Sequence, residues 1–215
     1  MKTIRAVLFD MDGVITDSMG LHEYAWRNAF KEIGLILDSH DIFRREGMSG
    51  IASVRDIFLE KGIEPPDDIQ LENLINRKHF HFKGEIDLFP HVDQIISYLS
   101  KRRIKLALVT GSHRSNVERI IPVTLLEKFS AIVTSDDVVN GKPDPESYER
   151  AMELLECTTD DCVVIENAPM GIKSAKNARL KCLAIETTLP QEYLSGADII
   201  FSDHRSLFEY LKSHI

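Results

Sequence analysis

Short apolar runs recur along the second half of the chain, and each of them ends in small or acidic residues. They begin at residues 104, 129, 161, 180 and 197 and read IKLALVTGS, FSAIVTSDD, DCVVIEN, LKCLAIET and ADIIFSD. Unbroken runs of this length are typical of strands that are buried on both faces of a parallel sheet. Helical patterns separate them at about 114–121, 145–156 and 169–179, and IRAVLF at 4–9 supplies one more strand. The alternation predicts an α/β fold with a doubly wound parallel sheet.

The segment from residue 18 to about residue 85 interrupts this alternation. It contains helical patterns such as LHEYAWRNAFKEIG and IASVRDIFLEKG, with no strand run between them. The pattern returns to the sheet through VDQIISYLSKRR. We therefore predict a core made of residues 1–15 and 87–215, with a small α-helical cap inserted at residues 16–86.

Composition narrows the classes of partner. The 215 residues carry a formal net charge of −8, which disfavours a broad nucleic-acid-binding face because phosphate backbones attract clustered Lys and Arg. No apolar stretch approaches the length of a membrane span. The three cysteines lack CxxC spacing and fit a reducing compartment. We expect a cytoplasmic protein, a monomer or weak homodimer, with neither nucleic acid nor membrane as its partner.

Polar residues stand at the ends of several predicted strands, where ligands bind in open α/β sheets. After the first strand come Asp10 and Asp12, which point to the same side because side chains alternate in extended backbone. Two adjacent carboxylates stay ionised together only beside a cation, and hard oxygen ligands suit Mg²⁺. The alternative is a solvated acidic turn, which the buried strand before the pair and Gly13 after it make weaker.

Three further strand ends add candidates. Thr110 closes LALVTGS, and its hydroxyl together with the backbone N–H groups of Gly111 and Ser112 suits phosphoryl oxygens. Lys142 lies in GKPDP, where two prolines stiffen the loop around one cation. Taken alone, Thr-Gly-Ser is a weak signal that also fits a simple turn, and a lone loop lysine usually faces solvent. The fourth strand end carries Glu166 and Asn167.

The motifs DMDGVITDS, VTGS, GKPDPESY and VVIENAPMGIKSA occur in this order, each at a predicted strand end. In this respect the chain resembles the haloacid dehalogenase superfamily of phosphohydrolases over almost its whole length. The similarity is to the branch with a helical cap after the first strand, which includes β-phosphoglucomutases and inorganic pyrophosphatases.

The resemblance implies a mechanism. Asp10 would be the nucleophile that forms an aspartyl-phosphate, and Asp12 would be the general acid and then the general base. Asp10 is expected to be ionised and Asp12 protonated at the start. Thr110 and Lys142 would bind phosphoryl oxygens, while Asp10, the backbone carbonyl of Asp12, and residues 166 and 167 (Glu166 and Asn167) would hold Mg²⁺.

One metal position departs from the pattern of the superfamily, because Asn167 brings no charge where relatives often place an aspartate. Glu46, in the cap segment RREGMSG, is the candidate that would replace the missing carboxylate. The alternative is that Glu46 is an ordinary exposed glutamate.

The cap also carries substrate clues. His22 and Lys78 match positions that lie between cap and core in β-phosphoglucomutase and are candidates for substrate binding. The cap arginine that binds a second phosphate there has no counterpart, since the segment reads EGMSG and ends in Gly50. We therefore expect a hydrolase acting on a small sugar phosphate or on pyrophosphate. The alternatives are a β-phosphoglucomutase-type phosphoryl transfer and a catalytically silent binding module.

Overall fold

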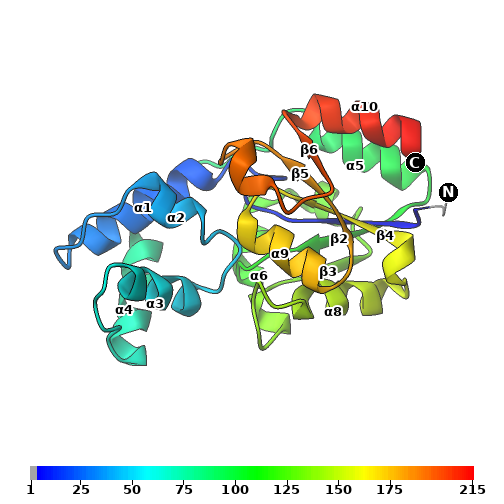
Figure 1. Cartoon of the computed structure of the whole chain (residues 1–215). Coiled ribbons are helices and arrows are strands. Elements are labelled where there is room, and N and C mark those ends of the chain that lie inside the picture. Colours follow the sequence, from blue (N-terminus) through cyan, green and yellow to red (C-terminus); the bar gives the residue numbers. More distant parts are fainter. Residues whose placement is uncertain (1–3) are drawn as a thin grey trace.

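A computed structural model describes residues 4–215, so that residues 1–3 of the predicted core lie outside the described part. Six strands form one parallel sheet in the order β3-β2-β1-β4-β5-β6 (Figure 1). The doubly wound α/β fold predicted from the apolar runs is confirmed. The strands are β1 (Ala6–Phe9), β2 (Lys105–Val109), β3 (Ala131–Val133), β4 (Cys162–Glu166), β5 (Lys181–Ile185) and β6 (Ile199–Phe201).

Helices cover both faces of the sheet, which explains why its strands show no polar alternation. On one face Val7 and Phe9 pack with α5 (Val92–Lys101) and α10 (His204–His214). On the other face Ala6 and Leu8 pack with side chains of two more helices. These are α8 (Glu146–Leu155) and α9 (Pro169–Asn177), while α6 (Arg114–Ile120) and α7 (Val123–Leu126) flank the β2–β3 edge.

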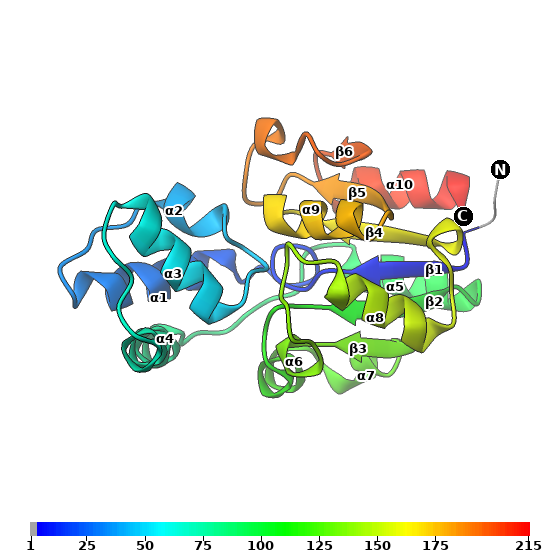
Figure 2. The same cartoon turned by 60° about the horizontal axis from the view of Figure 1, so that its bottom comes forward.

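Four helices between β1 and α5 form a separate unit beside the sheet (Figure 2). Their apolar faces meet in a cluster of their own, which includes Trp26, Phe30, Ile57 and Leu71. A separate cluster supports an inserted helical cap, while its exact bounds at 16 and 86 stay predictions. The helices are α1 (Met19–Lys31), α2 (Ser39–Phe43), α3 (Gly50–Glu60) and α4 (Asp68–His81).

The outgoing and returning linkers of the cap lie side by side. Thr16 forms an antiparallel bridge with Leu88. The Asp17 N–H donates to the Asp87 carbonyl at 2.9 Å, and the N–H of Phe89 donates to the carbonyl of Ile15 at 2.9 Å. The cap is thus hinged on two paired segments that begin directly after the Asp10–Asp12 stretch.

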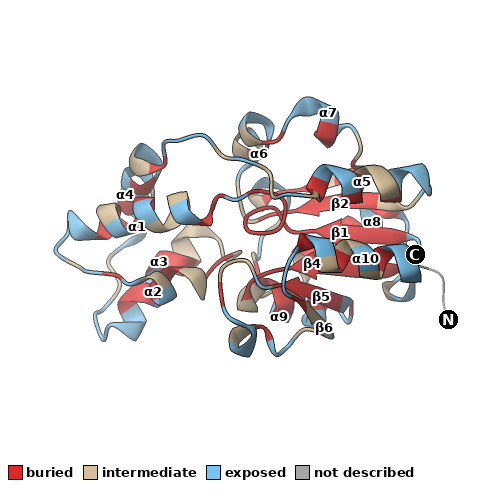
Figure 3. Cartoon of the chain, turned by 90° about the horizontal axis from the view of Figure 1, so that it is seen from above, coloured by how far each residue is buried: buried red, intermediate tan, exposed pale blue. Residues whose placement is uncertain are grey.

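The strands are the most buried part of the chain (Figure 3). Cys162 and Cys182 lie within β4 and β5 as buried free thiols, and Cys157 is also free. From residue 4 to the last residue, no helix has both the length and the apolar character that crossing a membrane requires.

Candidate active site

The chain turns sharply at the carboxyl end of β1 and leaves two carboxylates facing one cavity. Asp10 and Asp12 are both buried and line the cavity, while Met11 points into the apolar core, as the alternation predicts. The Met11 carbonyl accepts the N–H groups of Ile15 at 2.8 Å and Thr16 at 2.9 Å, which closes the turn. This tight turn holds Asp12 close to the end of the strand.

Lys142 is not a solvent-facing lysine, since its side chain is 1% exposed. Its Nζ lies 2.5 Å from Asp10 Oδ1 and 2.8 Å from Glu166 Oε1. Burial alone would lower the pKa of Lys142, but the charges of Asp10 and Glu166 raise it above its ordinary value. A permanent ammonium therefore sits between the ends of β1 and β4.

Glu166 hydrogen-bonds Lys142 and holds it in place. Its Oε1 accepts hydrogen bonds from Lys142 and, at 2.8 Å, from the Tyr148 hydroxyl, and its Oε2 accepts the N–H groups of Asn167 and Ala168 at 2.9 and 3.3 Å. A carboxylate offers about four lone-pair positions, and all of them are used. The predicted role of Glu166 as a metal ligand has no free oxygen to support it, and the carboxylate instead positions Lys142.

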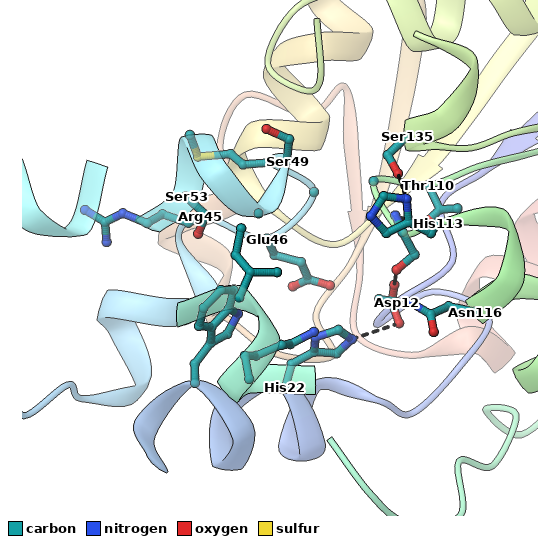
Figure 4. A pocket seen from close by; sticks show the side chains of 18 of the residues that line it. Asp12, His22, Arg45, Glu46, Ser49, Ser53, Thr110, His113, Asn116 and Ser135 are labelled. Atoms are coloured by element: carbon teal, nitrogen blue, oxygen red, sulfur yellow. Dashed lines mark hydrogen bonds and ion pairs between the residues drawn. The ribbon is translucent and has the colours of Figure 1, made fainter. Parts of the chain in front are cut away.

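Asp12 is held as an anion. Its Oδ1 lies 3.3 Å from His22 Nε2 (Figure 4). The same oxygen accepts from the Ser18 hydroxyl at 2.5 Å, and Oδ2 accepts from the Ser112 hydroxyl at 3.2 Å. Burial raises the pKa of Asp12, but His22 and Ser18 outweigh burial and lower it to about 2.

The pKa values of the two aspartates are shifted in opposite directions. Burial raises the pKa of Asp10, and the carboxylates of Glu166 and Asp12 add to the rise against the opposing charge of Lys142. Burial is the largest cause, and Lys142 offsets it only in part while its ammonium is shared with Glu166. Sequence reasoning could not see that sharing.

Glu46 is buried rather than exposed, and it reaches from the cap to the core. Its Oε1 accepts a hydrogen bond from Asn167 Nδ2 at 3.1 Å. The other oxygens of this pair, Glu46 Oε2 and Asn167 Oδ1, are buried without any hydrogen-bond partner. Burial and the charge of Asp10 raise the pKa of Glu46.

Two unpartnered oxygens beside Asp10 fit an oxygen-preferring cation such as Mg²⁺. Within residues 4–215 no three His, Cys, Asp or Glu side chains converge in a metal-binding group, so an amide and a backbone carbonyl would have to complete the set. Gly13, at a φ of 86°, leaves room for the Asn167 and Glu46 side chains. A Cβ at this position would overlap the Asn167 amide and approach Glu46 Oε1 to 3.0 Å.

The loop after β2 meets the cap. Thr110 Oγ1 accepts the Ser112 N–H at 3.0 Å, so that this amide, predicted to face a phosphoryl group, is engaged within the loop. A Cβ on Gly111 would lie 2.8 Å from the Gly47 carbonyl of the cap. The glycine therefore permits a close approach of cap and core at the cavity that the aspartates line.

His22 and Lys78 lie where cap and core meet. The His22 ring is 4.4 Å from that of Phe82, and Lys78 Nζ lies 4.5 Å from the same ring and 5.6 Å from that of Trp26. Burial lowers the pKa of Lys78 to about 8. Both residues line the cavity with Asp10, whereas their binding of substrate stays a prediction.

The cavity has a volume of about 520 Å³ between cap and core. Sequence reasoning missed Tyr148, whose hydroxyl donates to Glu166. In the sequence of amphipathic α8, Tyr148 looks like any other residue of the apolar face. Sequence reasoning also missed polar side chains of the cavity wall, since exposed helix positions of this kind look like ordinary surface. These are Glu72, Asn76 and His79 on α4. At α6 they are His113 and Asn116 (Figure 4).

Three known proteins show similarity along most of their length. The β-phosphoglucomutase of Bacillus subtilis is 29% identical over 205 residues, covering 92% of this chain and 88% of that protein. A phosphorylated carbohydrates phosphatase of Thermotoga maritima is 33% identical over 184 residues, 83% of each chain. Pyrophosphatase PpaX of Oceanobacillus iheyensis is 28% identical over 209 residues, 95% of each.

The fold is shared with solved structures. A hydrolase from Pseudomonas syringae superposes with a TM-score of 0.88 at 25% identity, covering 97% of this chain and 98% of that one. Residues 7–185 match the sequence profile of the family described as haloacid dehalogenase-like hydrolase. The chain therefore belongs to the haloacid dehalogenase-like hydrolase family and is an enzyme that acts on phosphorylated substrates.

Proposed function

We propose that this enzyme is a Mg²⁺-dependent phosphatase that hydrolyses a small phosphorylated metabolite through an aspartyl-phosphate on Asp10. One observation carries the proposal. Asp10 and Asp12 are buried at the end of β1 and line a single cavity, with Lys142 Nζ 2.5 Å from Asp10 Oδ1. A nucleophile, a proton carrier and a fixed positive charge thus meet at one point, which is what phosphoryl transfer needs.

The reaction would proceed in two displacements. A carboxylate oxygen of Asp10 attacks phosphorus, and the bond from phosphorus to the leaving oxygen breaks as Asp12 protonates that oxygen. Asp12 then takes a proton from water, which attacks phosphorus and releases Asp10 and inorganic phosphate. Lys142 and the Thr110 hydroxyl would bind phosphoryl oxygens and stabilise their charge. Arrival of an anionic phosphoryl group beside Asp12 would raise its low pKa and so supply the acid form.

A divalent cation would be held by Asp10, the Asp12 backbone carbonyl, the Asn167 amide oxygen and Glu46. Mg²⁺ there would supply positive charge to the phosphoryl oxygens and favour the ionised form of Asp10. Glu46 would bring the negative charge that Asn167 lacks.

The cavity favours a sugar phosphate as substrate. Its volume of about 520 Å³ would stay mostly unfilled around pyrophosphate. The wall combines the apolar ring of Trp26 with amide groups of Asn76 and Asn116, a combination that suits a hydroxylated carbon skeleton. The Thermotoga maritima relative is described as a phosphatase of phosphorylated carbohydrates, which supports this choice.

One other substrate and one other reaction have weaker support. Pyrophosphate is the second candidate, because Glu46 could bind a metal that travels with it. The mutase alternative needs a free cation for a second phosphate, but Gly50 provides none. The neighbouring Arg45 Nε instead donates to Asp56 at 2.7 Å, and its guanidinium also pairs with Glu60.

The decisive experiment is a phosphate-release screen with Mg²⁺ over sugar phosphates and pyrophosphate. We expect release from a hexose or pentose phosphate, and we expect Asp10→Asn to abolish it while circular dichroism shows an unchanged fold. Substantial turnover by Asp10→Asn, or by the wild type in EDTA, would refute the mechanism. Conversion of glucose 1-phosphate to glucose 6-phosphate with a bisphosphate primer would establish the mutase instead.

A further inference from the structure

A buried histidine at the start of α10 contacts both linkers of the cap, although it lies far from them along the chain. His204 is 5% exposed. Its Nε2 lies 2.6 Å from the Val14 carbonyl in the outgoing linker, 190 positions away in sequence. Its ring stacks on Phe89, in the returning linker, with ring centroids 4.7 Å apart and an angle of 22° between the planes.

The chemistry of the contact fixes the donor. A carbonyl oxygen only accepts, so Nε2 of His204 carries the proton and donates it. Burial lowers the pKa of His204. The neutral ring with its proton on Nε2 satisfies the bond and also stacks well on an aromatic neighbour.

The turn that His204 holds is the one that carries Asp12. Thr187, just after β5, donates its hydroxyl to the Gly13 carbonyl at 2.7 Å, and His204 holds the next carbonyl along. Side chains from two parts of the core thus hydrogen-bond the consecutive carbonyls of Gly13 and Val14, directly after Asp12. The paired bonds of Asp17 and Phe89 across the linkers begin at the same place.

We propose that His204 is a positioning residue for phosphoryl transfer, which ties the catalytic turn and both cap linkers to the core. The bond to Val14 resists displacement of the turn, and the stacking on Phe89 resists separation of the returning linker. When the cap opens and closes, its motion is then confined to residues beyond these anchors. Asp12 keeps its place relative to Asp10 throughout the cycle.

A matched pair of substitutions tests the donor. His204→Gln keeps an N–H donor at similar reach, and His204→Met has a similar length without a donor. Because a misplacement of about 1 Å can cost up to about a hundredfold in rate, we expect His204→Met to lower kcat for p-nitrophenyl phosphate about tenfold or more, with KM changed less than about threefold. His204→Gln should restore kcat to within about threefold of the wild type.

Hydrogen exchange gives a readout that does not depend on activity. In His204→Met the amides of Asp17 and Phe89 should exchange at least about tenfold faster, while amides of β1 and β4 keep their wild-type rates. An unchanged kcat and unchanged exchange in His204→Met would overturn the proposal. So would a uniform rise in exchange over the whole sheet, since that marks general destabilisation.

Two outcomes separate this inference from the proposed function. If the wild type lacks phosphatase activity, exchange at Asp17 and Phe89 still tests the anchoring role alone. If His204→Met does not fold, His204→Gln decides. Wild-type exchange at Asp17 with kcat within threefold supports the role of the donor, and faster exchange at Asp17 or a larger fall in kcat contradicts it. Because glutamine has no ring to stack on Phe89, exchange at the Phe89 amide should rise in this variant, and an unchanged rate there would contradict the role of the stacking.

Discussion

At the scale of single residues, Glu46 is the side chain whose role depends most on its surroundings. It is a loop glutamate in the cap, yet it is buried against Asn167 and has one unpartnered oxygen. A buried carboxylate oxygen without a donor is costly unless a cation satisfies it. The neutral Asn167 and the buried Glu46 are therefore best treated as a pair of ligands for one cation.

Replacing Glu46 tests this pair. We expect Glu46→Gln to raise the Mg²⁺ concentration for half-maximal activity about tenfold or more, because one ligand charge is lost. The loss of rate should be greater for pyrophosphate than for an aryl phosphate. Glu72→Gln, at another cavity-lining glutamate of the cap, is the control and should leave the Mg²⁺ requirement unchanged. Equal Mg²⁺ titrations for the two variants would exclude Glu46 as a ligand.

The low pKa of Asp12 predicts a pH dependence of stability. A carboxyl whose folded pKa is about 2, below the unfolded value of about 3.9, stabilises the fold above pH 4. This contribution, about 2 kcal/mol, should disappear as the pH falls from about 4 to about 2. Urea unfolding of wild type and Asp12→Asn should show a gap in stability that narrows over this window. A constant gap would mean that Asp12 has an ordinary pKa.

At the scale of elements, the start of α9 packs directly against the Glu166 carboxylate. A Cβ on Gly171 would overlap that carboxylate, whereas a Cβ on Gly20 in α1 would meet nothing within 4 Å. The carboxylate cannot easily move away, since Lys142, Tyr148 and two backbone amides hold it. The position of Lys142 thus depends on close packing of α9 at one glycine.

The two glycines make a matched pair of substitutions with opposite expected signs. Gly171→Ala should destabilise the protein by about 2 kcal/mol, as overpacked cores do, and should lower kcat by displacing Lys142. Gly20→Ala should stabilise it by up to about 1 kcal/mol, because alanine loses less entropy in a helix. Thermal unfolding and kcat measure both effects. If both variants were more stable than the wild type, the Glu166 carboxylate would be able to move away from a Cβ at position 171 without loss of stability.

At the scale of the whole molecule, the proposed metal site joins the cap to the core, since Glu46 comes from one and Asn167 from the other. A ligand that binds only the folded protein stabilises it by about 2.7 kcal/mol at a concentration of 100 Kd. We therefore expect Mg²⁺ to raise the Tm of the wild type. The rise should be much smaller in Asp10→Asn and unchanged in Glu72→Gln. A Tm that does not respond to Mg²⁺ in the wild type would contradict a metal site at this junction.

The residue pattern of the chain was enough to predict the sheet and the polar residues at the carboxyl ends of its strands. Apolar runs specify strands locally, and parallel strands bring their carboxyl ends to one edge, so the residue pattern alone places Asp10, Asp12, Thr110 and Lys142 together. The break in alternation likewise predicted an inserted helical unit. These features are readable because each depends on local periodicity or on a general rule of topology.

The pairing of these side chains could be seen only once the chain was folded. Lys142 bridges Asp10 and Glu166, and hydrogen bonds occupy both oxygens of the Glu166 carboxylate. Burial raises the pKa of Asp10, whereas His22 and Ser18 lower that of Asp12. The contact between Glu46 and Asn167 spans 121 positions in sequence, and that of His204 with Val14 spans 190. Hydrogen-bond partners and burial arise from packing across such separations, and no local pattern of residue types encodes them.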